Sequence, residues 1–115
     1  MHRLIRKFRP ALSGLCCAFK DKSVVIQLVL GAVTVLAGLF LHLDWMEWAV
    51  ILTLTGLVIT AEIFNTAIER LCDFVQPEID PRIKLIKDYS AAAVLMISIT
   101  AAVAGLMVLI HHFTG

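Results

Sequence analysis

Three long apolar stretches, separated by short polar segments, dominate the pattern of the chain. The first, VVIQLVLGAVTVLAGLFLHL, covers residues 24–43 and contains no formal charge. Twenty such residues are enough for a helix to cross a bilayer core of about 30 Å. Two further helices are expected over about residues 47–74 and 83–112. The pattern therefore predicts three membrane-spanning helices.

Residues 3–20 show a different pattern, in which apolar side chains recur at helical intervals opposite basic ones. Leu4 and Phe8 belong to the apolar face, and Arg6 belongs to the basic face. This pattern is typical of an amphipathic helix on a membrane surface, with its basic face toward anionic headgroups. The alternative is that the positive charges serve only as a topology signal. Pro10 is expected to separate a short first turn from the main helix.

Length and composition place the whole chain, residues 1–115, in one membrane domain, and the predicted helices make its class all-α. The hydrophobic share is 60% and the mean hydropathy is +0.91, which is too apolar for an ordinary soluble domain. The net charge of +1 says little about partners, and the sequence shows no nucleic-acid-binding motif. Cys16, Cys17 and Cys72 lack the spacing of a disulfide or metal motif, so we expect them to be packing residues. No cleavable signal peptide is expected.

Basic residues set the predicted topology. All ten lie either before the first span or between Glu69 and Asp88, so the N-terminus and the second link are expected in the cytoplasm. The first link, HLDWMEW, has no Lys or Arg and carries two tryptophans that suit an outer interface. His111 and His112 then fall at the outer face, where we expect contact with solvent or headgroups rather than with a metal.

A polar stripe runs along the inner half of the second predicted span. At 100° per residue, five polar side chains share a sector roughly 100° wide. They are Glu62, Asn65, Thr66, Glu69 and Asp73. The same arithmetic places Lys84, Lys87 and Asp88 on one face of the third span. Acids inside or beside a membrane are costly unless they are paired or solvated, so the two polar faces predict a functional site.

These side-chain types suit phosphoryl transfer. Carboxylates can hold the Mg²⁺ of a nucleotide complex, lysine can neutralise phosphate, and a further acid can accept a hydroxyl proton. Glu62 lies roughly 22 Å along the helix from Glu47, and Glu69 lies roughly 33 Å along it. Glu62 is therefore placed for a lipid hydroxyl and Glu69 for a metal at the water side. Alternatives are a purely structural set of ion pairs, or an ion-coupled transporter in which Glu62 carries the proton.

Two segments, AEIFNTAIERLCDFV and IKLIKDYSAAAVL, closely resemble the prokaryotic diacylglycerol kinase and undecaprenol kinase family. The shared pattern is Glu-x-x-Asn-[Ser/Thr]-Ala-x-Glu, an Asp four residues on, and Lys-Asp-x-x-[Ala/Ser]-Ala-Ala-Val-Leu after a short link. The resemblance covers about residues 3–112. It implies a small lipid kinase of the bacterial cytoplasmic membrane, with three spans and a surface helix, assembled as a homotrimer with shared active sites. Motifs of soluble kinases are absent.

By matching positions, the resemblance implies that Glu62 is the catalytic base and Asn65 an amide that organises the site. Glu69 would bind the Mg²⁺ that accompanies ATP. The family has a second metal-binding acid before the first span. Asp21 occupies that position if one residue is deleted, whereas an ungapped alignment places Lys22 there. Asp21 is preferred, because a lysine could not bind Mg²⁺.

The resemblance also implies nucleotide contacts from Lys87 and Asp88, and from Glu78 in the link. Pro10 stands where relatives commonly carry Tyr, so that contact is not expected here. The link PEIDPRIKLIKD resembles the version in Gram-positive undecaprenol kinases more than that in Gram-negative diacylglycerol kinases. This favours undecaprenol as the substrate, with diacylglycerol as the alternative.

Overall fold

The computed structural model describes residues 2–115, and these form four helices without a strand. The helices are α1 (His2–Ala18), α2 (Lys22–Leu41), α3 (Trp45–Val75) and α4 (Pro81–Thr114). The predicted all-α class, with three long apolar helices after an N-terminal one, is confirmed. Met1, which the single-domain prediction includes, lies outside the described residues.

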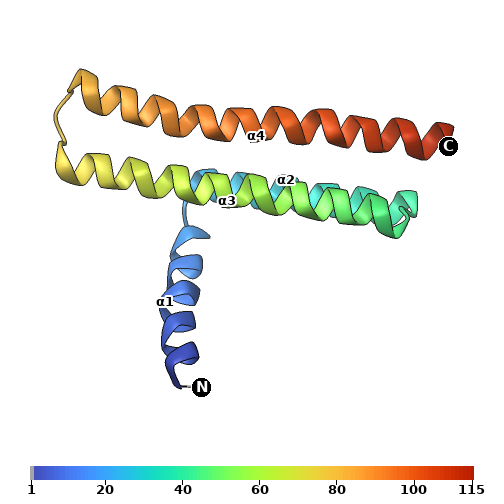
Figure 1. The fold of residues 1–115 in the computed structure, drawn as a ribbon, viewed down its shortest axis with the longest axis horizontal. Coiled ribbons are helices and arrows are strands. Elements are labelled where there is room, and N and C mark those ends of the chain that lie inside the picture. The colour runs from blue at the N-terminus through green and yellow to red at the C-terminus, as the bar shows by residue number, and fades with distance from the viewer. Residues whose placement is uncertain (1) are drawn as a thin grey trace.

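Helices α2, α3 and α4 lie side by side, and α3 contacts both of the others (Figure 1). Helix α1 projects away from them, across their common direction. The turn between α2 and α3 and the end of α4 lie at one end of the bundle, and the link between α3 and α4 lies at the other. Length and composition allow each of α2, α3 and α4 to cross a membrane.

The three spans differ in length, so two of them extend beyond the third at one end of the bundle. Helix α2 has 20 residues, α3 has 31 and α4 has 34. At 1.5 Å per residue they measure roughly 30, 46 and 51 Å. The ends of α3 and α4 that meet at the second link therefore extend beyond α2, on the left of Figure 1. We call these the inner ends, and the opposite ends of the bundle the outer ends.

Aspartate caps explain why the three spans begin about two residues before their predicted starts. Asp21, Asp44 and Asp80 precede α2, α3 and α4, and each side chain accepts a backbone N–H of the first turn. The N–H of Glu47 keeps the pKa of the Asp44 carboxyl below its usual range, and the Arg82 side chain does the same for Asp80. A helix can begin directly after such a residue, because its free N–H groups are already satisfied.

Two glycines let α2 and α3 approach closely. Gly31 and Gly38 are buried in α2. A Cβ atom at Gly31 would lie 2.9 Å from Cγ2 of Thr55, and one at Gly38 would lie 2.7 Å from Cη2 of Trp48. Any larger residue would force a shift at the contact with Thr55 or Trp48, because both distances are shorter than normal carbon contacts.

The prediction that Pro10 interrupts the first helix was wrong, because α1 continues through it. Proline removes one backbone donor, but its fixed φ is compatible with a helix, and the turns on either side keep their bonds. No residue of α1 is buried, so Cys16 and Cys17 are exposed and are not packing residues within this chain. Cys72 is buried in α3, as expected.

The outer ends of α3 and α4 are joined by a contact that the sequence did not predict. Nδ1 of His112 lies 3.1 Å from Oε1 of Glu47, 65 residues away. His112 therefore pairs with a carboxylate rather than only with solvent or headgroups. Glu47 is 7% exposed, and its Oε2 atom has no hydrogen-bond partner among the described residues. Because burial separates this carboxylate from water, a hydrogen bond from a nearby donor stabilises it.

Few apolar side chains are buried inside the chain. Val24, Ile51 and Cys72 form the buried apolar set among residues 2–115, whereas long runs of Leu, Ile, Val and Phe remain exposed. An apolar surface of this extent needs lipid or another chain against it. The folded chain is therefore built for a membrane.

Candidate active site

The polar stripe of α3 changes from buried to exposed as the helix leaves α2. Glu62 and Asn65 are 7% and 9% exposed, whereas Glu69 and Asp73, further along the stripe, are exposed. Burying an acid in an apolar bundle costs free energy unless a partner compensates it, so a buried acid indicates a functional site. The stripe therefore offers one sheltered carboxylate next to carboxylates that water can reach.

Asn65 connects the stripe to α4. Its Oδ1 atom accepts a hydrogen bond from the Ser90 hydroxyl at 2.6 Å, and its Nδ2 donates to Oε1 of Glu69 at 3.5 Å. The first bond is buried and joins residues 25 apart in the chain. A single amide therefore bridges the buried and exposed parts of the site.

The two polar faces predicted for the inner ends carry two ion pairs. Nζ of Lys87 lies 2.6 Å from Oδ1 of Asp73, which joins α4 to α3. Nζ of Lys84 lies 2.7 Å from Oδ2 of Asp88, four residues along the same helix. Exposed pairs of this kind contribute little to stability and exchange easily, so both lysines remain available to an anionic ligand.

Asp21 lies at the junction between α1 and α2, close to the stripe. Its carboxylate accepts the backbone N–H of Ser23 at 3.1 Å and lies 3.6 Å from Nη2 of Arg70. Asp21 and Glu69 are also the two acids whose charges act on Glu62. Three carboxylates, one from the start of α2 and two from the stripe of α3, thus share a small region in which Arg70 pairs with Asp21.

The oxygen chemistry of this region suits Mg²⁺, which usually takes one or two protein carboxylates and completes its shell with water and phosphate oxygens. Residues 2–115 contain no group of three or more His, Cys, Asp or Glu side chains arranged to hold a metal by themselves. Asp21 and Glu69 therefore supply oxygen atoms of the type that Mg²⁺ binds, but the described residues do not form a metal site by themselves.

Glu78 lies in the link between α3 and α4, where it helps to line a hollow of about 230 Å³. Asp73, Lys84 and Lys87 line the same hollow. The structure thus places Glu78 and Lys87 on one hollow, whereas Asp88 is not among the lining residues and pairs with Lys84. Of the three predicted nucleotide contacts, two share one hollow.

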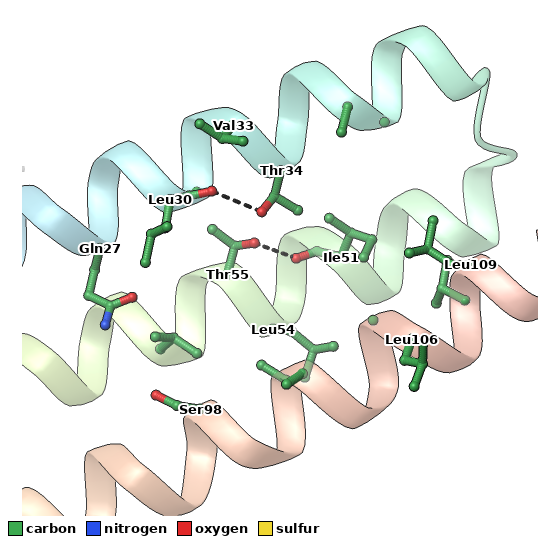
Figure 2. Close-up of a pocket in the computed structure, with 18 of the residues that line it drawn as sticks. Gln27, Leu30, Val33, Thr34, Ile51, Leu54, Thr55, Ser98, Leu106 and Leu109 are labelled. Carbon is green, nitrogen blue, oxygen red and sulfur yellow. Dashed lines mark hydrogen bonds between the residues drawn. The ribbon is translucent and has the colours of Figure 1, made fainter.

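A wider groove of about 690 Å³ runs between α2, α3 and α4 (Figure 2). The hydroxyls of Thr34 and Thr55 point back to carbonyls of their own helices, at 2.9 and 2.7 Å. Gln27 and Ser98 supply the other polar side chains, and the rest of the lining is aliphatic or glycine. None of the predicted site residues lines it. The groove suits hydrocarbon and offers nothing to a nucleotide.

The sequence interpretation missed Ser90 and Arg70. Ser90 carried a signal, because it is a polar residue at the start of an alanine-rich run and lies three residues after Lys87, on the same helix face. Arg70 carried none, since it lies about 100° around the helix from Glu69. Its contact with Asp21 depends on the position of the N-terminus of α2.

Several known proteins are similar to this chain over most of its length. The sequence model of the family described as prokaryotic diacylglycerol kinase matches residues 9–109. A diacylglycerol kinase of Helicobacter pylori is 30% identical over 95 residues, which is 82% of this chain and 74% of that protein. The undecaprenol kinase of Bacillus subtilis is 26% identical over 109 residues, 94% of this chain and 89% of its own length. A diacylglycerol kinase of a Synechocystis strain is 33% identical over 104 residues, 89% of this chain and 59% of its own.

Proposed function

This chain belongs to the prokaryotic diacylglycerol kinase family, and we propose that it transfers the γ-phosphoryl group of ATP to undecaprenol. The family and the kinases among its relatives make the chain a lipid kinase that uses ATP in a membrane. One observation carries the proposal. The buried Glu62 lies on the same stripe as Asn65 and the exposed Glu69, and that stripe faces Ser90 and Lys87 of α4.

In the proposed reaction, the lipid hydroxyl oxygen attacks the γ-phosphorus of ATP. A new oxygen–phosphorus bond forms, the bond to the bridging oxygen of the leaving ADP breaks, and the hydroxyl proton passes to Glu62. Glu62 suits this role because its carboxylate can accept a proton and lies in the sheltered part of the stripe, where a lipid hydroxyl can meet it. A hydroxyl anchored in lipid can reach this depth, whereas ATP reaches the exposed end of the stripe.

Asp21 and Glu69 would hold Mg²⁺ bound with the nucleotide. When bound there, the metal would neutralise the negative charge that develops on the phosphate oxygens. Support comes from the surplus of acid in this region, where Asp21, Glu62 and Glu69 stand against Arg70. The position of Asp21 beside the stripe also supports aligning it, rather than Lys22, with the family's first metal-binding acid.

Lys87, Asp88 and Glu78 would contact the nucleotide. Lys87 and Glu78 line one hollow, and the ammonium group of Lys87 is placed there to neutralise phosphate oxygens. Lys87 is paired with Asp73 in the free protein, so phosphate binding would exchange one anionic partner for another. Such an exchange is feasible because exposed ion pairs are weak.

The distribution of basic residues supports an orientation with the N-terminus and the active site in the cytoplasm, in the bacterial cytoplasmic membrane. A homotrimer with shared sites is supported by the sparse core of a single chain and by the stripe that it leaves partly uncovered. Residues 1–115 then form one kinase domain. An ion-coupled transporter does not fit this chain, because the matched family is described as a kinase family.

Undecaprenol is proposed over diacylglycerol because of the proline-containing link after α3, which resembles that of Gram-positive undecaprenol kinases. Relatives bear both names, so the choice of lipid needs a direct test. Purified protein is supplied with γ-labelled ATP and equal amounts of undecaprenol and diacylglycerol in the same micelles. The label should enter undecaprenyl phosphate at least about tenfold faster, which corresponds to about 1.4 kcal/mol in the transition state.

Glu62→Gln protein serves as the control for label that does not depend on the site. If only phosphatidic acid is labelled, the substrate is diacylglycerol and not undecaprenol. If neither lipid were labelled by protein that is folded and oligomeric, the proposed reaction would be wrong for both acceptors.

A further inference from the structure

Ser90 makes the shortest buried polar contact between α3 and α4. Its Oγ atom lies 2.6 Å from Oδ1 of Asn65, and the two side chains belong to residues that are 7% and 9% exposed. Polar groups so well enclosed have little access to water as an alternative partner. Whatever orientation the Asn65 amide takes is therefore decided by its protein neighbours.

The neighbouring side chains allow only one orientation of the Asn65 amide. An ionised carboxylate only accepts hydrogen bonds, so the amide nitrogen of Asn65 must face Glu69, as it does at 3.5 Å. The amide oxygen then faces Ser90. A hydroxyl can donate or accept, but beside a carbonyl oxygen it must donate. The Ser90 hydroxyl therefore donates its hydrogen bond to Oδ1 of Asn65.

We propose that Ser90 is a positioning residue for phosphoryl transfer, which acts by holding the Asn65 amide with its N–H groups toward Glu69. The proposal rests on the proposed function, since it concerns the same site. Without the hydroxyl, the amide oxygen would be buried without a donor, and rotation of the amide would turn its oxygen toward the Glu69 carboxylate. Two acceptors would then face each other, and Glu69 would lose the donor that orients it.

The test is a double-mutant cycle of Ser90→Ala and Asn65→Ala. Two quantities are measured for each protein at matched oligomer content. They are kcat for lipid phosphorylation, and the affinity for the Mg²⁺ complex of a non-hydrolysable ATP analogue by calorimetry. Ser90→Ala should lower kcat about three- to tenfold, the effect of one lost buried hydrogen bond. It should also raise the Mg²⁺ concentration needed for half-maximal activity, because Glu69 is less well oriented.

Two matched variants separate this role from general packing. Ser90→Thr keeps the hydroxyl and should restore kcat and the Mg²⁺ requirement to within about twofold of wild type. Ser98→Ala makes the same change on α4, but in the apolar groove away from the site, and should leave both quantities unchanged. In the Asn65→Ala background, Ser90→Ala should have no further effect on analogue affinity, or on kcat where turnover is measurable, because there is no amide left to hold.

The results that would overturn the inference are distinct from those that would overturn the proposed site. If Ser90→Ala keeps wild-type kcat and Mg²⁺ dependence, or if its effect is as large without Asn65 as with it, Ser90 does not act through the amide. If Asn65→Ala itself has wild-type activity, the role of Asn65 in the proposed function is wrong, and the inference falls with it.

Discussion

Nζ of Lys87 lies 2.6 Å from Oδ1 of Asp73, and this ion pair joins α4 to α3 across the link that separates them. Both partners line the same hollow as Glu78. Asp73 therefore holds the ammonium group where the proposed nucleotide would place its phosphates. The pair prepares Lys87 for binding, and it also has to open when phosphate oxygens take the place of Asp73.

Asp73→Asn should raise the KM for ATP by about two- to fivefold and change kcat less than twofold, because exposed ion pairs make small contributions. An amide keeps the shape of Asp73 but not its charge, so Lys87 loses its attachment to α3. Steady-state kinetics at saturating lipid and varied Mg·ATP measure the change. A lower KM would mean that Asp73 competes with the nucleotide instead of orienting Lys87.

Asp80→Ser provides the matched control for that change. It removes one negative charge from the same link, and serine still caps α4, so helix α4 should keep its start. If Asp80→Ser shifts the KM for ATP as much as Asp73→Asn does, the effect comes from the general charge of the link and not from contact with Lys87.

Glu62→Gln should reduce turnover by about 10²–10⁴, the usual contribution of a general base, while nucleotide affinity stays within a few-fold. Glutamine preserves the shape of the side chain but cannot accept the hydroxyl proton. Glu47→Gln is a close control, because Glu47 lies on the same helix and is also 7% exposed, but at the outer end. Retention of more than about a tenth of wild-type turnover by Glu62→Gln would rule out the general-base role.

Glu69→Gln and Asp21→Asn should each reduce activity in a way that raised Mg²⁺ partly restores, because each change removes one charged oxygen ligand. Asparagine caps helices as well as aspartate does, so Asp21→Asn leaves the start of α2 intact and isolates the charge. Asp44→Asn makes the same change at the start of α3. Activity is measured against Mg²⁺ at fixed ATP, and a wild-type response of Asp21→Asn would show that Asp21 is not a ligand.

The fold could be predicted because its determinants are local or are imposed by the bilayer. A span needs about twenty apolar residues, and the chain contains three such stretches. The exceptions depend on contacts between distant residues. His112 pairs with Glu47 only because the outer ends of α3 and α4 lie together, and no local sequence pattern predicts that contact.

One part of the site could likewise be predicted from the sequence, and the other part depends on contacts between helices. Helical periodicity alone places Glu62, Asn65 and Glu69 on one stripe, since 100° per residue is a property of one helix. The partner of Asn65 depends on how α4 is rotated about its axis relative to α3. Small residues along α4 give little preference for one rotation, so the sequence places Ser90 on the face of Lys87 but could not pair it with Asn65.

His112→Ala should lower the free energy of unfolding by about 1–3 kcal/mol, because it leaves the buried carboxylate of Glu47 without the donor 3.1 Å away. The loss is measured by denaturant titration in detergent. His111→Ala, at the exposed neighbouring position, should change stability by less than about 0.5 kcal/mol. Kinase activity of the folded fraction should be unchanged, since the pair lies at the opposite end of the bundle from Asn65. Equal effects at both histidines would show that the pair contributes nothing specific.

The working unit should be an oligomer in which one subunit completes the site of another. A single chain leaves Glu69 and Asp73 exposed and buries few apolar side chains, and a neighbour could shield both surfaces from lipid. If Asp21 and Glu62 of one working site come from different subunits, mixing Asp21→Asn protein with Glu62→Gln protein should restore activity. Some mixed sites would then contain both intact groups, and random mixing of two inactive chains predicts recovery of roughly a quarter of wild-type activity per shared site. Differently tagged subunits purified in tandem provide the mixed species. Mixed oligomers that form but stay inactive would show that Asp21 and Glu62 act within one chain.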